Sequence, residues 1–176
     1  VTISEVPIYD STPPPNDPTP INIGSSLVGV GITNSQTVTI SNIGAGNLNV
    51  SFSKSGTNQA DFTIDTPASV VVPGTPLDVS VTCTPSATGL LTATLTVTHD
   101  GTGTPTSPVT YSLECTGTAT PVPDYESDPL PSSTIDMGSS LVGVTIDVLD
   151  VVTVRNLGGA TLDLNSLTVS GGNVGD

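Results

Sequence analysis

Residues 91–98 read LTATLTVT, an unbroken alternation of apolar and polar side chains. Every odd-numbered position carries leucine, alanine or valine, and every even-numbered position carries threonine. A period of two predicts a half-buried β-strand, because successive side chains of an extended chain point to opposite faces. The apolar face would pack between two sheets, whereas the β-branched threonines suit a strand face that water covers.

The neighbouring segments repeat this pattern. Residues 77–83 (LDVSVTC) and 109–116 (VTYSLECT) also keep their apolar side chains on one face. Turn signals such as Pro-Gly at 73–74 separate the segments, and no stretch shows helical periodicity. We therefore predict an all-β fold, a series of immunoglobulin-like antiparallel β-sandwiches with about seven strands per complete module. The expected strands of the first module are 36–42, 48–53, 62–64, 68–72, 77–83, 91–98 and 109–116.

The sequence also contains an internal repeat. The heptapeptide GSSLVGV at residues 24–30 returns unchanged at 138–144. Further along, VTISNIG at 38–44 corresponds to VTVRNLG at 152–158. Self-similarity at a fixed spacing indicates a tandem array of modules. The chain would therefore hold one whole module and about half of a second.

This repeat predicts the domain boundaries. Residues 1–20 are interpreted as the end of a preceding module (residues 1–4) and a proline-rich linker, and residues 21–120 as a complete immunoglobulin-like module. Residues 121–134 form a second linker, rich in proline and acidic residues, and residues 135–176 form the first half of an incomplete module. Proline restricts its own backbone and that of the preceding residue, so such linkers would be stiff and would set module orientation.

Both linkers contain a Val-Pro-x-Tyr sequence. Pro7 and Tyr9 in the first correspond to Pro123 and Tyr125 in the second. Because the two sequences occupy matching places in the repeat, we expect these four residues at inter-module junctions. Both tyrosines should be at least partly buried there.

The two cysteines, Cys83 and Cys115, both lie in the first module. Each lies at the far end of an expected strand and shares the inward parity of its apolar neighbours, so the two should meet at one pole of the sandwich. A disulfide and an oxidising compartment are therefore expected. The alternatives are two buried free thiols or half of a metal site, and the latter lacks ligands because His99 is the only histidine.

Composition excludes several classes of partner. The chain has 16 acidic residues, one lysine and one arginine, for a formal net charge of −14. Binding to nucleic acid depends on clustered Lys and Arg, so we expect no nucleic-acid partner. No apolar run is long enough to span a membrane, so we expect no membrane insertion. An export signal would have been removed or would lie outside this stretch.

No arrangement of residues predicts catalysis or a cofactor. His99 precedes Asp-Gly at an expected hairpin turn, and we interpret it as an exposed turn histidine rather than a general base. Asp124, Glu126 and Asp128 are weak calcium candidates, because calcium needs several converging oxygen ligands. A solvated acidic linker is the default interpretation of these three residues. We expect no enzymatic activity.

Several segments resemble a known family. The run VTCTP at 81–85, the segment THD at 98–100 and YSLECTG at 111–117 resemble hydin-like (ASH/MSP-type) immunoglobulin-like domains. They are most similar to the repeats of bacterial secreted choice-of-anchor D proteins. VTISNIG at 38–44 resembles a strand-Asn-x-Gly segment of the same domains. The resemblance implies an exported, extracellular or cell-surface repeat protein, although such sandwiches host many functions.

The leading hypothesis is a non-catalytic structural module of an extracellular filament or cell-surface stalk. Copies of the chain, or further modules of the same chain, would join head to tail. The alternative is an adhesin module that binds a glycan or a protein, and a third is a non-catalytic appendage of a secreted enzyme. The chain has no tryptophan and three tyrosines, which disfavours a stacking platform for sugars.

The second module is expected to lack its later strands. Its half sandwich would expose Val152, Val154, Leu162 and Leu164. Further modules in a longer array, strand addition by another subunit, or a truncated and misfolded end would each account for this.

Overall fold

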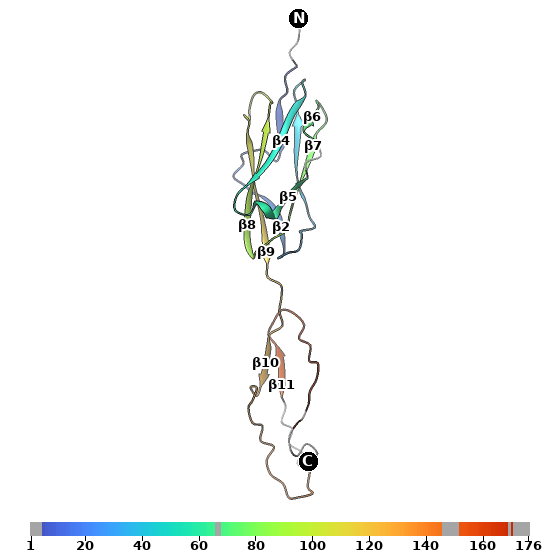
Figure 1. The fold of residues 1–176 in the computed structure, drawn as a ribbon, viewed down its shortest axis with the longest axis vertical. Coiled ribbons are helices and arrows are strands. Elements are labelled where there is room, and N and C mark those ends of the chain that lie inside the picture. The colour runs from blue at the N-terminus through green and yellow to red at the C-terminus, as the bar shows by residue number, and fades with distance from the viewer. Residues whose placement is uncertain (1–4, 66–67, 146–151, 169, 171–176) are drawn as a thin grey trace. The chain divides into compact units, whose positions relative to one another are not determined.

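The computed structural model describes residues 5–65, 68–145, 152–168 and 170. The chain divides into two compact units, Val1–Thr120 and Pro121–Asp176 (Figure 1). The predicted end of a preceding module at residues 1–4 lies outside the described residues. Within the described residues the only helix is a short 3-10 turn, Gln59–Asp61, and all other regular structure is strand.

The first unit contains nine strands, shown in Figure 1. They are β1 (Tyr9–Thr12), β2 (Ile21–Leu27), β3 (Gln36–Asn42), β4 (Leu48–Ser55), β5 (Phe62–Asp65), β6 (Val70–Val71), β7 (Leu77–Cys83), β8 (Gly89–His99) and β9 (Val109–Thr118). One sheet has the order β1-β3-β7-β5, and the other has the order β2-β9-β8-β4-β6.

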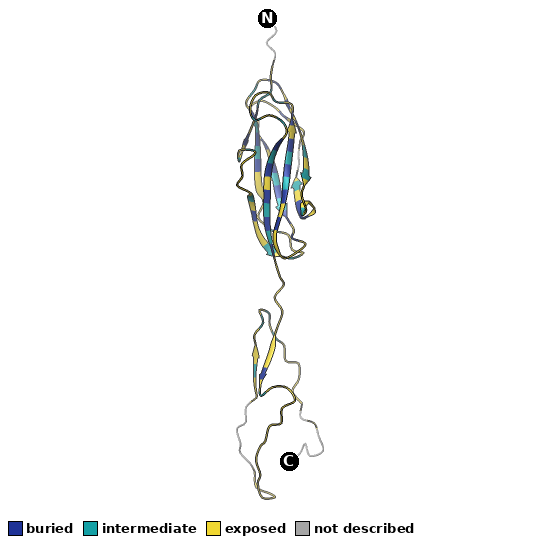
Figure 2. Ribbon diagram, turned by 90° about the vertical axis from the view of Figure 1, so that its left-hand side faces the viewer, coloured by how far each residue is buried: buried dark blue, intermediate teal, exposed yellow. Residues whose placement is uncertain are grey.

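The two sheets enclose a single apolar core. Alternate residues of β3, β7, β8 and β9 are buried, as the banding of the strands in Figure 2 shows. On β8 the leucines, alanine and valine of the LTATLTVT stretch point inward, and Leu95 and Val97 are fully buried. The prediction of an all-β, immunoglobulin-like sandwich is confirmed.

Two details of that prediction are wrong. The first unit has nine strands rather than about seven, because the segment before β3 contributes β1 and β2. The sandwich is also not wholly antiparallel, since β2 pairs with β9 in parallel. Between β1 and β2 the chain contains five prolines at 13–20. Proline cannot donate to a strand ladder, so the chain leaves one sheet at Thr12 and joins the other at Ile21.

The proline-rich linker predicted within residues 1–20 therefore needs correction. β1 pairs antiparallel with β3, with Tyr9 opposite Asn42 and Thr12 opposite Thr39. The loop after β1 is also attached to the sandwich, because the Asn16 backbone N–H donates to the Thr110 carbonyl at 2.8 Å. The first unit thus includes residues that were expected to join modules.

The second unit contains two strands in its described residues, β10 (Tyr125–Asp128) and β11 (Thr153–Asn156). They pair antiparallel, with Tyr125 opposite Asn156 and Asp128 opposite Thr153. This is the register of β1 on β3, transferred to the matching residues of the sequence repeat. That the second unit is half of another sandwich stays a prediction.

Candidate functional site

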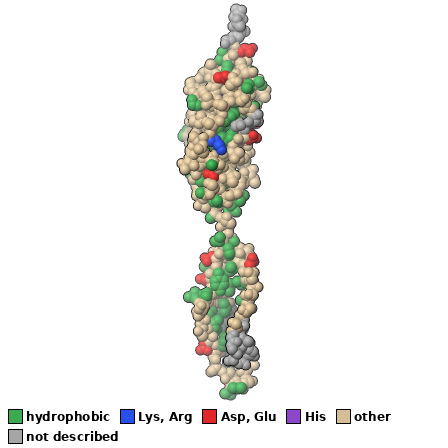
Figure 3. Space-filling view, in the orientation of Figure 1, with side chains coloured by type: hydrophobic (Ala, Val, Ile, Leu, Met, Phe, Trp, Pro, Cys, Tyr) green, Lys and Arg blue, Asp and Glu red, His purple; other side chains and the backbone are tan. Residues whose placement is uncertain are grey.

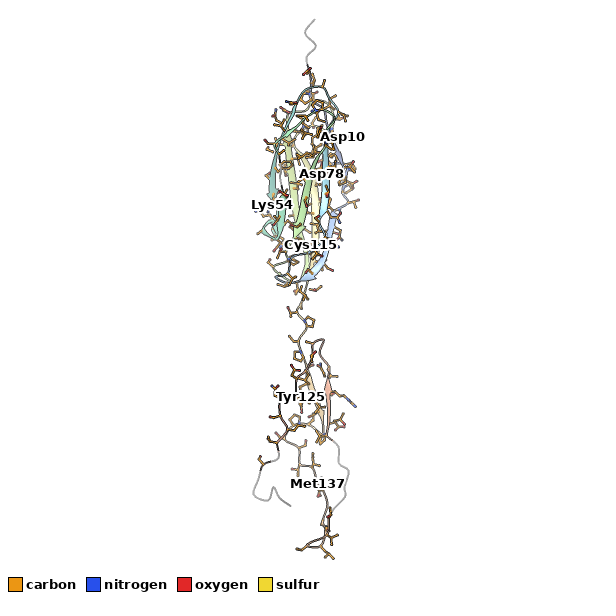
Figure 4. The ribbon with its side chains drawn as sticks, turned by 90° about the vertical axis from the view of Figure 1, so that its right-hand side faces the viewer. Asp10, Lys54, Asp78, Cys115, Tyr125 and Met137 are labelled. Atoms are coloured by element: carbon orange, nitrogen blue, oxygen red, sulfur yellow. A yellow bond between two sulfur atoms is a disulfide. The ribbon has the colours of Figure 1, made fainter. Side chains whose placement is uncertain are left out.

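A disulfide joins the two sheets of the first unit. Cys83 ends β7 in one sheet and Cys115 lies near the end of β9 in the other, with their Cα atoms 6.6 Å apart. Both cysteines are buried, and Figure 4 labels Cys115 inside the sandwich. The expected bond is present, so neither free thiols nor half of a metal site describes this pair.

A chain of hydroxyl groups lies at the other end of the core. The Tyr9 hydroxyl lies 2.6 Å from that of Tyr111, which donates to Ser11 Oγ at 2.6 Å. Ser11 in turn donates to the Pro13 carbonyl at 3.1 Å. Since each hydroxyl donates one hydrogen, this order makes Tyr9 the donor to Tyr111. Burial raises the pKa of both tyrosines, so both stay protonated and neutral.

Tyr9 is therefore a core residue of the first unit. Only 2% of its surface is exposed, and its hydrogen bond to Tyr111 ties β1 of one sheet to β9 of the other. The expectation that Tyr9 packs at an inter-module junction is replaced by this internal role. Pro7 lies beside it, and its carbonyl accepts a hydrogen bond from the Thr102 backbone at 2.9 Å.

His99 stacks on Tyr9. The two rings are 4.2 Å apart and tilted by only 11°. His99 is 6% exposed, so the prediction of an exposed turn histidine is wrong. It is the last residue of β8 and keeps the inward parity of that strand, whereas the turn begins at Asp100. Neither ring nitrogen has a hydrogen-bond partner among the residues that the structure describes.

The surroundings of His99 favour its neutral form. Burial lowers the pKa of His99, and the neighbouring Asp100 carboxylate and Gly101 backbone oppose this shift more weakly. Tyr9 is neutral and adds no compensating charge. Asp100 points its carboxylate to Asn49, whose backbone N–H donates to it at 2.8 Å. The Asn49 side-chain amide also donates to this carboxylate, at 2.5 Å, and the side-chain and backbone contacts together lower the pKa of Asp100 and keep it ionised.

Acidification is expected to destabilise the first unit through His99. Its folded-state pKa lies below the ordinary value of 6.5, so the unfolded chain binds a proton first as the pH falls. Stability present above pH 6.5 is then lost as the pH falls toward the folded-state pKa. Urea unfolding at pH 7 and pH 5 should show this loss. The variant His99→Phe keeps a buried ring against Tyr9 and should remove most of this pH-dependent loss of stability. An unchanged pH dependence in His99→Phe would contradict the assignment of the loss to His99.

Asn42 holds the start of the first unit in place. Its side-chain oxygen accepts from the Ile8 backbone at 3.2 Å and from the Gly44 backbone at 3.1 Å. Its amide group donates to the carbonyls of Gly46 at 2.6 Å and Val71 at 2.9 Å. The buried amide thus uses both donor hydrogens and two acceptor positions. Gly44 is required here, because a side chain would overlap the Val6 carbonyl oxygen.

Asn156 repeats the Asn42 hydrogen bonds in the second unit, apart from the one to the Val71 carbonyl. Its side-chain oxygen accepts from Asp124 at 3.1 Å and from Gly158 at 3.0 Å, and its amide donates to Ala160 at 2.6 Å. A side chain at Gly158 would overlap the Val122 carbonyl oxygen. We call each of these arrangements an asparagine clasp, one centred on Asn42 and the other on Asn156. The two clasps fix the same register between two strands in both units.

Replacing the clasp asparagine of the first unit should cost about 2–3 kcal/mol of unfolding free energy, because Asn42→Ala leaves buried backbone groups without partners. Chemical denaturation of the oxidised chain would measure the loss. The matched variant Asn156→Ala should leave unfolding of the first unit unchanged. If Asn42→Ala were as stable as the parent chain, the clasp would not organise the fold.

The predicted junction and calcium residues of the second linker do not converge on a site. Tyr125 is 48% exposed, and Glu126 pairs with Arg155 at 3.8 Å. Glu126 and Asp128 lie on one face of β10, opposite to the face of Tyr125. The described part of the chain contains no group of three or more His, Cys, Asp or Glu side chains that could hold a metal ion. A junction role for Tyr125 and Pro123 stays a prediction.

A cavity lies between the proline-rich loop of the first unit and the neighbouring strands. Its volume is about 520 Å³. It is bounded by the end of β1 and the starts of β2 and β3, including Thr12, Asn22 and Gln36. Hydroxyl, amide and proline groups dominate the lining, and Asp17 is its only charged residue. The backbone N–H of Thr19 lowers the pKa of Asp17, so this carboxyl is ionised.

Sequence reasoning missed the hydroxyl chain, the clasp and the cavity. A signal for the clasp was present, because an Asn followed two residues later by Gly recurs at 42 and 156. No such signal joins Tyr9 to Tyr111, which are 102 residues apart. Of the described helices, none is long and apolar enough to cross a membrane.

Comparison with protein families gives one match. The sequence pattern of the family described as "Abnormal spindle-like microcephaly-assoc'd, ASPM-SPD-2-Hydin" (ASH) matches residues 18–107. These residues span the strands from β2 to β8 and include Asn42 and Cys83. None of the curated proteins matches the chain.

Comparison with solved structures gives matches at low sequence identity. A Porphyromonas gingivalis protein of unknown function is 15% identical, with a TM-score of 0.49, and the match covers 66% of this chain and 49% of that one. The chain thus spans about half the length of that structure. An ASH/PapD-like domain of human CEP192 is 12% identical, with a TM-score of 0.49 and coverage of 64% and 86%. SSP-19, an MSP-domain-like protein of Caenorhabditis elegans, is 21% identical, with a TM-score of 0.37 and coverage of 56% and 94%.

Proposed function

The chain belongs to the ASPM-SPD-2-Hydin (ASH) family, and from that premise we propose that it is a non-catalytic structural segment of an extracellular filament or cell-surface stalk. Its modules are arranged in series and joined head to tail, either within one chain or between copies. Because the family defines a sandwich and not a function, the proposal depends on features of this chain.

The observation that carries the proposal is the duplicated asparagine clasp. Asn42 and Asn156 fix the same strand register in two successive units, with matching hydrogen bonds to the chain segment that enters each unit. A serial array needs every unit to begin in the same way, so that each holds its incoming chain identically. A single-copy catalytic or ligand-binding domain has no such need.

The disulfide and the surface composition support an extracellular location. Cys83–Cys115 fits an oxidising compartment, where disulfides form and persist. Only two residues of the chain are Lys or Arg, and Figure 3 shows acidic side chains scattered over a mostly uncharged surface. A net charge of −14 keeps copies from aggregating at random.

Fractionation of the source cells tests the proposed location. An antibody to the first unit should detect the protein in the surface or extracellular fraction, and thiol labelling before reduction should find no free cysteine. A cytoplasmic protein with two reactive thiols would contradict the proposal. An intracellular protein of known compartment, followed in the same fractions, controls for leakage.

The cavity favours a second candidate, an adhesin module. Its neutral lining of hydroxyl and amide groups would suit an uncharged polyhydroxylated ligand such as a sugar, and the ionised Asp17 would repel anions. A glycan array is the direct screen. Binding that is lost in Gln36→Ala would support this candidate, whereas binding unaffected by that change would place any ligand elsewhere.

A further inference from the structure

In the first unit, an early strand and the last strand run side by side in the same direction. β2 pairs in parallel with β9, from Ile21 opposite Leu113 to Leu27 opposite Thr118. In Figure 1 the chain enters this unit at one end and leaves it after β9 at the other. Both strands run from the entry end toward the exit end. Tension between the two ends of the unit would therefore draw β2 and β9 past each other along their length.

The direction of a load decides how well a strand pair resists it. The hydrogen bonds of a ladder run between the strands, so a load along the strands acts on all of them at once. A load that separates the strands from one end breaks them one after another. Side chains add to the β2–β9 ladder. The Thr118 hydroxyl donates to the Ser26 carbonyl at 3.1 Å, and the Asn22 amide donates to Glu114 at 2.8 Å.

The segment before β2 is also attached along its length. β1 pairs with β3, and the Tyr9 hydroxyl lies 2.6 Å from that of Tyr111. In the loop that follows, the Asn16 backbone N–H donates to the Thr110 carbonyl at 2.8 Å. Tyr111 and Thr110 both belong to β9. A load that enters before β1 thus reaches β9 through β1, the loop and β2 in turn.

The disulfide limits how far the unit can extend. Cys83 and Cys115 are 32 residues apart, and the closed loop between them includes all of β8. This loop cannot be pulled straight while the bond is intact. Since an extended chain spans about 3.4 Å per residue, the oxidised unit should lengthen by about 100 Å less than the reduced unit when it unfolds under load.

We propose that the β2–β9 ladder is a mechanical clamp, which keeps the first unit folded when tension is applied along the chain. The Cys83–Cys115 bond is the stop that limits extension once the clamp fails. The inference deepens the proposed filament role and rests on it for its biological meaning. It assigns the load to β2 and β9 and not to the other strand pairs of the two sheets.

Optical tweezers on the oxidised full chain can compare two pulling directions. Handles on Glu5→Cys and Ala119→Cys pull the unit end to end, along the ladder. Handles on Val30→Cys and Ala119→Cys pull at the ends of β2 and β9 that lie together, so they separate the same ladder from one end. All three positions are exposed, and both native cysteines are in the disulfide. End-to-end pulling should require a severalfold higher unfolding force, and equal forces in the two directions would overturn the proposal.

Two proline variants locate the clamp, with the handles at positions 5 and 119. The Val28 N–H donates to the Thr118 carbonyl, and Ser26 faces the same edge because successive strand residues alternate. Ser26→Pro therefore removes a hydrogen-bond donor of the ladder and should lower the force toward that of the one-ended pull. Ser25→Pro places its ring on the open edge of β2 and should leave the force unchanged. Equal forces for both variants would place the clamp elsewhere and overturn the proposal.

Reduction of the disulfide tests the stop in the same instrument. The expected result is a gain in extension of about 100 Å on unfolding, and equal extensions of the oxidised and reduced chains would overturn this part. The comparison of pulling directions leaves β2 unchanged, so it decides the matter even where Ser26→Pro does not fold. All of these measurements use purified chain. A cytoplasmic location would therefore contradict the proposed filament role and leave the clamp standing, whereas equal forces would do the reverse.

Discussion

Replacing both cysteines by alanine is expected to lower the unfolding free energy of the first unit by about 3–4 kcal/mol. Cys83 and Cys115 are 32 residues apart, so the bond restricts a long loop of the unfolded chain. The bond also links the two sheets, and the strands it joins, β7 and β9, each lie inside a sheet with a neighbour on both sides. Urea denaturation of the parent chain and of the double variant would measure the difference.

Reduction of the parent chain provides the control. It breaks the bond without removing side-chain atoms, so it separates the effect of the cross-link from the effect of smaller side chains. We expect reduction alone to account for most of the loss. A reduced chain as stable as the oxidised one would show that packing, and not the disulfide, holds the two sheets together.

Tyr9→Ala is expected to cost about 3–5 kcal/mol, the range for large aromatic residues removed from a core. The change leaves a cavity beside His99 and removes the hydroxyl that donates to Tyr111, which keeps only its hydrogen bond to Ser11. Thermal or chemical denaturation monitored on the first unit would measure the loss. Tyr9→Phe keeps the ring and should cost only about 1 kcal/mol, through the lost hydroxyl.

Tyr125→Ala is the matched variant in the second unit. Tyr125 occupies the same place in the repeat but is half exposed, so its removal should change stability by less than about 0.5 kcal/mol. Comparing the stability losses of Tyr9→Ala and Tyr125→Ala therefore distinguishes a core residue from a junction residue. Equal and small effects of Tyr9→Ala and Tyr125→Ala would contradict the core assignment of Tyr9.

Alternation was sufficient to predict most of the first unit. Segments such as 77–83 and 91–98 have one apolar face and one polar face, and this pattern has a single solution, a strand between core and solvent. The same parity predicted the pairing of Cys83 with Cys115. The structure places both cysteines in the core, where their strands face each other across the two sheets.

The start of the first unit could not be predicted in this way. β1 is only four residues long, has one large apolar side chain and runs directly into prolines, so its sequence is typical of a linker. Its place in the sheet depends on Asn42 and Tyr111, which are distant in sequence. His99 was misjudged for a related reason, because a histidine before Asp-Gly has the composition of a turn although its parity is that of the core.

The second unit shows the limit of reasoning from a repeat. The repeat led us to expect both Tyr9 and Tyr125 to be at least partly buried at junctions, and Tyr125 is half exposed, although the pairing of β10 with β11 does follow that of β1 with β3. Burial depends on the strands that cover the pair, and no described strand does so. Repetition therefore predicts local pairing better than it predicts exposure.

Electron microscopy of native material, labelled with an antibody to the first unit, tests the proposed filament role most directly. Modules joined in series predict thin fibres of uniform width, with antibody bound at regular intervals along their length. Isolated globular particles, each carrying the label and never joined end to end, would contradict it.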